Sequence, residues 1–130
     1  MSSNRLIKLP VYRKALELQA MSQAIALCVS RRQDLPALYA SESLRDQVAG
    51  SLLTDSLLIP EQIALAMNTR SLAIREHSLH FIHIMTRNLA SYCKGLEMDG
   101  VREKEYLDLL RQELRLFRLS FRNWRKSLGY

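Results

Sequence analysis

The chain of 130 residues is poor in residues that interrupt helices, with four glycines and three prolines. Hydrophobic residues make up 48% and charged residues 25%, which is ordinary for a folded globular domain. Sandwiches and barrels need a turn about every 8–12 residues, so this composition disfavours them and predicts one all-α domain over residues 1–130. The formal net charge of +6 favours a polyanionic partner.

Membrane and secretory signals are missing from the sequence. No apolar run reaches the ~18–20 residues that span a bilayer, and the first residues lack the apolar segment of a secretory signal. We therefore expect a cytoplasmic protein that does not associate with membranes. In that compartment Cys28 and Cys93 are expected to be reduced and buried among apolar residues. A disulfide between them is the alternative.

The first long helix is predicted to begin at Pro10, because the fixed φ of proline suits a first helical turn. Its apolar residues then recur every three or four positions as far as Val29, which is the helical period. Residues 1–9 are expected to form an N-terminal tail. Residues 30–36 are polar, basic and interrupted by a proline, and they are predicted to be the longest loop.

The second and third helices follow from the same periodicity. The second is predicted to begin near Ser41, a good N-cap residue, and to run to Ala66. Pro60 falls inside it and removes one backbone hydrogen bond, which predicts a kink within a single helix. The third is predicted from Leu72 to the neighbourhood of Gly95, where the glycine is expected to end it.

The last helix carries the clearest pattern, and Asp99 is expected to cap its start. Its apolar residues are spaced by three and four positions without a break: Leu107, Leu110, Leu114, Phe117, Phe121, Trp124 and Leu128. This heptad spacing is typical of coiled coils and helical bundles. Four helices joined by short connections predict an up-down-up-down antiparallel four-helix bundle.

A row of arginines runs beside this apolar seam. It consists of Arg111, Arg115, Arg118, Arg122 and Arg125, each one position after a seam residue. One residue is about 100° of helical rotation, so the row flanks the buried stripe. Guanidinium groups match phosphate oxygens with paired N–H donors. We therefore interpret the row as a nucleic-acid-binding surface, assisted by Arg31 and Arg32 in the first loop.

Two other interpretations of the arginine row stay open. The row is also consistent with a solvated helix face whose arginine stems cover apolar edges. It could also pair with carboxylates of another subunit at an interface. Catalytic signatures such as a glycine-rich phosphate loop or His-Glu-x-x-His are missing, so we expect no enzymatic activity and no cofactor.

A small cluster of potential metal ligands lies in the third helix. Glu76, His80 and His83 are spaced by four and three residues, so they share one face, and such residues can ligate zinc or iron. No second cluster supplies the remaining ligands. We therefore expect no metal, and interpret these histidines as additional cationic surface.

Three segments resemble the bacterial four helix bundle protein family. They are residues 9–18 (LPVYRKALEL), residues 56–64 (SLLIPEQIA, where the family has Ser-Ile-Pro-x-Asn-Ile-Ala) and residues 80–85 (HFIHIM). The family includes proteins encoded in intervening sequences of large-subunit ribosomal RNA and the Avd proteins of diversity-generating retroelements. The chain departs from the family at residues 65–69, where LAMNT replaces Glu-Gly-x-Gly-Arg, so it resembles a divergent member.

The resemblance implies a small cytosolic bundle that assembles as a homopentamer with parallel subunits around a central channel. In the retroelement branch it implies binding to a reverse transcriptase and its RNA. Leu109, Leu116 and Leu119 lie outside the seam and need cover, which also favours oligomerisation. The leading hypothesis is thus a non-enzymatic basic homo-oligomer that binds nucleic acid through phosphates. The alternative is a protein–protein assembly or scaffold module whose arginine row serves a subunit or partner interface.

Overall fold

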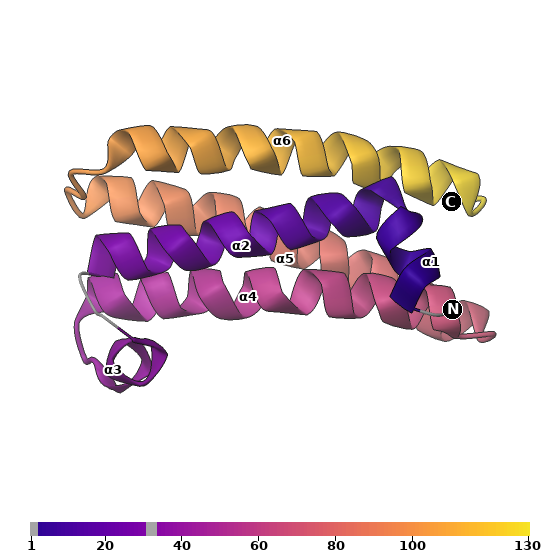
Figure 1. The fold of residues 1–130 in the computed structure, drawn as a ribbon, viewed down its shortest axis with the longest axis horizontal. Coiled ribbons are helices and arrows are strands. Elements are labelled where there is room, and N and C mark those ends of the chain that lie inside the picture. Colours follow the sequence, from indigo (N-terminus) through magenta and orange to yellow (C-terminus); the bar gives the residue numbers. More distant parts are fainter. Residues whose placement is uncertain (1–2, 31–33) are drawn as a thin grey trace.

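The computed structural model describes residues 3–30 and 34–130, and within them it is a bundle of four long antiparallel helices (Figure 1). The long helices are α2 (Pro10–Ser30), α4 (Leu44–Asn68), α5 (Leu72–Met98) and α6 (Lys104–Ser127). Two short helices, α1 (Ser3–Lys8) and α3 (Leu35–Ala40), precede α2 and α4. The predicted all-α four-helix architecture is confirmed.

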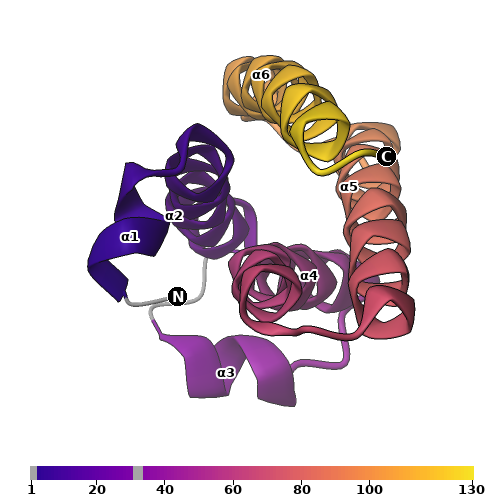
Figure 2. The same ribbon diagram turned by 90° about the vertical axis from the view of Figure 1, so that its right-hand side faces the viewer.

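Helices that follow one another among the four long ones are neighbours in the bundle. Viewed along the axis, α4 lies between α2 and α5, and α6 stands at the opposite corner (Figure 2). The contacts of α4 with α2 and α5 are extensive, whereas α6 makes fewer contacts with α2 and α5. One helix, α6, is therefore the least covered of the four, although it has the most pronounced apolar seam.

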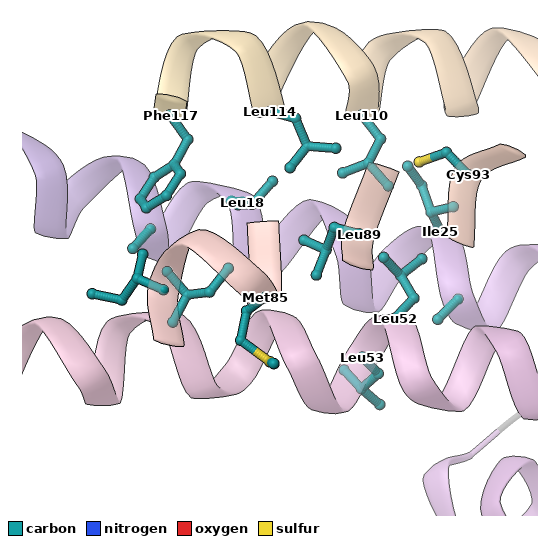
Figure 3. Close-up of a cluster of buried hydrophobic side chains, with 14 of the residues drawn as sticks. Leu18, Ile25, Leu52, Leu53, Met85, Leu89, Cys93, Leu110, Leu114 and Phe117 are labelled. Carbon is teal, nitrogen blue, oxygen red and sulfur yellow. The ribbon is translucent and has the colours of Figure 1, made fainter. Parts of the chain in front are cut away.

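The core runs along the bundle axis and is filled by aliphatic side chains with Phe117 among them (Figure 3). Leu18, Leu52, Leu89 and Phe117 are fully buried. All members of the predicted seam from Leu107 to Trp124 are buried, and Leu128 is partly buried against them. The heptad spacing therefore identified the face of α6 that packs inward.

Two short helices replace segments that were predicted to be irregular. The predicted tail contains α1, which buries Leu6 and packs on α2. The predicted loop contains the start of α3, because Asp34 accepts a hydrogen bond from the Ala37 backbone N–H at 2.8 Å. Pro36 therefore lies in the first turn of a helix, where its missing N–H costs nothing, and the prediction of a loop through this residue was wrong.

The start of α4 also differs from the prediction. Ser43, not Ser41, is the N-cap, and its side chain accepts from the Asp46 backbone N–H. Ser41 ends α3 and donates its hydroxyl to the Asp46 carboxylate at 2.5 Å. Pro60 is buried within one continuous α4, as predicted.

The connection between α5 and α6 is set by Gly100. The helix passes through Gly95 and ends at Met98, so the predicted stop at Gly95 was wrong. Gly100 has a φ of 84°, which turns the chain so that the Val101 N–H bonds to the Leu96 carbonyl at 3.2 Å. Asp99 does not cap α6 and instead accepts a hydrogen bond from Arg45 Nε at 2.6 Å. The N-cap of α6 is Glu103.

The two cysteines have different environments. Both are free thiols, as expected, and Cys93 is buried in the core. Cys28 is exposed, so the prediction that it is buried was wrong. Its side chain lies outside the apolar face of α2, whose buried residues nearby are Ile25, Ala26 and Val29. None of the described helices is long and apolar enough to cross a bilayer.

Candidate nucleic-acid interface

The charges of the chain are separated along the bundle axis. One end of the bundle combines α1, the first half of α2, the second half of α4, the first half of α5 and the second half of α6 (Figure 1). We call these residues, 3–20, 57–85 and 115–130, the basic end. Its basic residues are Arg5, Lys8, Arg13, Lys14, Arg70, Arg75, Arg115, Arg118, Arg122, Arg125 and Lys126, and its acidic residues are Glu17, Glu61 and Glu76. The basic end thus has a formal charge of +8.

The remaining described residues, 21–30, 34–56 and 86–114, carry more acidic than basic groups, with ten against six. This separation of charge arises because the antiparallel topology brings together helix ends that are far apart in the sequence. The overall charge of +6 is therefore concentrated at one end.

Several cations of the basic end are used to hold the chain together. Arg13 donates to the carbonyls of Ile7 and Lys8 at 3.0 and 3.1 Å, which ties α2 to α1. Arg75 donates to carbonyls at the end of α4 and in the following turn, both at 3.1 Å. Lys14 forms an ion pair with Glu17 at 2.9 Å. These side chains are structural.

The arginines in the second half of α6 are different. Arg115, Arg118 and Arg122 are exposed, and their guanidinium groups make no hydrogen bond or ion pair with any residue that the structure describes. Arg125 is partly buried, with its guanidinium 5.7 Å from the centre of the Phe121 ring. No acidic residue occurs between Arg115 and the end of the chain at residue 130. These four arginines form an unneutralised strip.

Arg111, the first member of the predicted row, is not part of this strip. Its guanidinium lies 2.6 Å from a Glu97 carboxylate oxygen on α5 and 3.0 Å from an Asp108 oxygen. Partial burial lowers the pKa of Arg111, but the hydrogen bonds to Glu97 and Asp108 raise it more, and the net shift is upward. Its charge is therefore neutralised within the protein. Arg31 and Arg32 lie outside the described residues, so their part in the prediction is untested.

The first half of α5 contributes a second basic element next to the strip. A cavity of about 340 Å³ between α5 and α6 is lined by His83, Thr86, Arg118, Phe121, Arg122, Arg125, Lys126 and Tyr130. An adjoining cavity of about 290 Å³ shares His83, Arg125 and Tyr130, and adds Glu76, Leu79 and His80. The histidines that the sequence suggested as extra cationic surface do lie beside the arginines.

The environment of His83 disfavours its protonated form. Loss of hydration in the cavity wall lowers the pKa of His83, and the positive charges of Arg87 and Arg125 lower it further.

Within the described part of the chain, no group of three or more His, Cys, Asp and Glu residues is arranged to hold a metal ion.

The chain matches no protein-family model, no curated protein and no solved structure.

Proposed function

We propose that the protein is a non-enzymatic, homo-oligomeric helical bundle that binds RNA or DNA through phosphate contacts at its basic end. The observation that carries the proposal is the strip of Arg115, Arg118, Arg122 and Arg125, whose charges no described carboxylate neutralises. Ion pairs form elsewhere on the same helix, at Arg111. Four neighbouring cations without a carboxylate partner repel one another, and this favours the binding of an anion from outside the protein.

The dimensions of the strip suit a nucleic-acid strand. Arg115 and Arg125 are ten residues apart, which is about 15 Å along a helix. Successive phosphates of one strand in a duplex are separated by about 3.4 Å along the axis, so the strip can reach about four of them. Contacts of this kind position a protein on the backbone without reading bases. We therefore expect little sequence preference.

The exposed leucines of α6 support self-association. Leu109, Leu116 and Leu119 are 49%, 48% and 54% exposed. Leu109 and Leu116 lie on the flank of α6 away from the arginine row, so an interface there would leave the arginine strip accessible. Leu119, in contrast, lies beside Arg115 and Arg122. Several basic ends in one assembly would bind one nucleic acid with increased avidity. The sequence resemblance to four helix bundle proteins, in which a pentamer is implied, is consistent with this arrangement.

The second candidate is a protein–protein assembly module, and the same exposed leucines favour it. In that case the arginine strip would pair with carboxylates of another subunit, or of a partner enzyme such as the reverse transcriptase that the resemblance implies. The two candidates make opposite predictions about charge reversal in the strip.

The test is fluorescence anisotropy with labelled RNA and labelled DNA in a salt series, with light scattering on the same samples. The variant is Arg115→Glu, Arg118→Glu, Arg122→Glu. A matched control, Lys94→Glu, Arg102→Glu, Lys104→Glu, reverses three exposed charges at the other end.

We expect the strip variant to lose nucleic-acid binding at unchanged mass, while the control keeps most of its affinity. Dissociation of the strip variant into monomers would support the assembly module instead. Absence of binding by the wild-type protein at 50 mM salt would overturn the proposal.

A further inference from the structure

The cavity between α5 and α6 has the composition of a site for a single anion. We propose that it binds one terminal phosphate group, as in a phosphate monoester, with Arg118, Arg122 and Arg125 as donors and His83 as a fourth. The site shares Arg118, Arg122 and Arg125 with the strip, but it is concave and its donors come from both α5 and α6, which suits a single phosphate group. Its existence does not require that the strip binds nucleic acid.

The shape and lining of the cavity are those of a small-ligand site. Its volume of about 340 Å³ is at the lower end of the range for such sites, roughly 300–1,000 Å³. Phe121 provides an apolar wall, and Arg125 lies against the Phe121 ring, so this guanidinium is held in place before a ligand arrives. Arg125 Nε is also buried and has no hydrogen-bond partner among the described residues.

Tyr130 is held at the cavity by the turn that ends α6. Gly129 has a φ of 89°, a backbone conformation that glycine adopts without strain. The Tyr130 N–H then bonds to the Arg125 carbonyl at 2.9 Å, and the Gly129 N–H to the Lys126 carbonyl at 3.0 Å. The turn therefore places Tyr130 on the wall that both cavities share.

The charges around the cavity are predominantly positive. The side chains of α6 contribute Arg118, Arg122, Arg125 and Lys126, and α5 contributes His80, His83, Arg87 and Glu76, of which Arg87 acts on His83 from outside the lining. Glu76 lines the adjoining cavity and not the larger one. A bound dianion would be favoured by these cations, and tetrahedral phosphate oxygens suit the paired N–H donors of arginine.

Binding should be coupled to protonation of His83. In the free protein the loss of hydration and the neighbouring cations disfavour the imidazolium form, whereas a dianion in the cavity would favour it. The pKa of His83 therefore rises on binding, and the affinity for an anion of fixed charge increases as the pH falls and His83 becomes protonated. Phosphate itself also titrates, with a second pKa of about 6 in its monoesters. Sulfate keeps its charge near this pH and isolates the contribution of His83.

The experiment is an NMR titration of the imidazole resonances with inorganic phosphate and with sulfate, at constant ionic strength set by chloride. We expect saturable shifts at His83 and a rise in its pKa of about one unit, which corresponds to tenfold tighter sulfate binding to the protonated form. His77, outside both linings, is the internal control. Shifts equal at His77 and His83, or none at either, would overturn the proposal.

Variants separate this site from the proposed function. Arg122→Gln and His83→Gln should weaken phosphate binding at least tenfold, whereas Arg115→Gln, outside the lining, should leave it unchanged and weaken only nucleic-acid binding. Thermal melting monitored by circular dichroism checks that each variant folds. Equal phosphate affinity in all three variants would refute the site even if RNA binds.

A pair of oligonucleotides identifies the source of the phosphate. Binding of a 5′-phosphorylated strand more tightly than the 5′-hydroxyl strand of the same sequence, with the preference lost in His83→Gln, would assign the site to nucleic-acid ends. Equal binding of the two strands, with inorganic phosphate still bound, would assign it to small phosphate esters. Both results support the cavity as a phosphate site.

Discussion

Arg111 and Arg118 occupy equivalent positions in the arginine row, one heptad apart, but the structure gives them different partners. Arg111 is neutralised by Glu97 and Asp108, while Arg118 is exposed and unpaired among the described residues. We therefore predict that Arg118→Gln reduces the salt dependence of RNA binding and that Arg111→Gln does not. The two substitutions remove the same charge, so each serves as the control for the other.

The magnitude follows from the number of unpaired cations. Each phosphate neutralised on a single strand contributes about 0.7 to the slope of log affinity against log salt. The four arginines of the strip together predict a slope of about −2.8, or a loss of roughly 50-fold in affinity between 50 and 200 mM salt. Arg118→Gln should reduce the slope to about −2.1 and the loss to roughly 20-fold.

Arg111→Gln should act on stability instead. It removes an ion pair that joins α6 to α5, and partly exposed pairs of this kind contribute up to about 1 kcal/mol. Anisotropy titrations at four or more salt concentrations measure the slopes, and urea unfolding measures the stability. If Arg111→Gln reduces the slope as much as Arg118→Gln, Arg111 binds phosphate despite its ion pairs with Glu97 and Asp108, and the reasoning is refuted.

Three further predictions concern the fold and the assembly. Gly100→Ala should lower the free energy of unfolding by about 1 kcal/mol, because φ is 84° at this residue. Gly95→Ala should be neutral or stabilising, because Gly95 lies inside a helix and the nearest atom to an added Cβ is 4.0 Å away. Thermal melts measure both, and equal effects would contradict the role of Gly100. Leu116→Ser should lower the mass measured by light scattering at unchanged helicity, and an unchanged mass would remove the exposed leucines from the interface. Burial and the hydrogen bond to Asp55 raise the pKa of Tyr92 from 10.0 to about 12. The folded state therefore retains a proton that the unfolded chain loses, and stability should decline between pH 10 and 12. Tyr92→Phe should reduce this decline, and an identical pH profile would contradict the shift.

Periodicity predicted the four long helices because each buries one continuous stripe of apolar residues. The ends of the helices were harder to predict. In α5, for example, either Gly95 or Gly100 could end the helix on sequence grounds. Gly95 fits inside the helix without a close contact, and only Gly100 adopts the positive φ that ends it. The start of α3 was missed although Asp34 and Pro36 together are a helix-start signal, because the residues before them are polar and the helix is only six residues long.

The arginine row was visible in the sequence, but the division within it was not. Asp108, three residues before Arg111, was a local sign of an ion pair. Glu97 lies on the preceding helix, and its contact with Arg111 depends on the register between α5 and α6. The same register brings His83 opposite Arg118 and Arg125. Spacing within one helix carries no information about such contacts between helices.

Cross-linking of a photoreactive RNA to the protein, followed by mass spectrometry of the peptides, tests most directly whether the basic end is the nucleic-acid surface. We expect cross-links within residues 115–130 and in the first half of α5, and few within residues 97–113, where the carboxylates lie. Cross-links concentrated on residues 97–113, or distributed evenly over the chain, would contradict a phosphate-binding surface at the basic end.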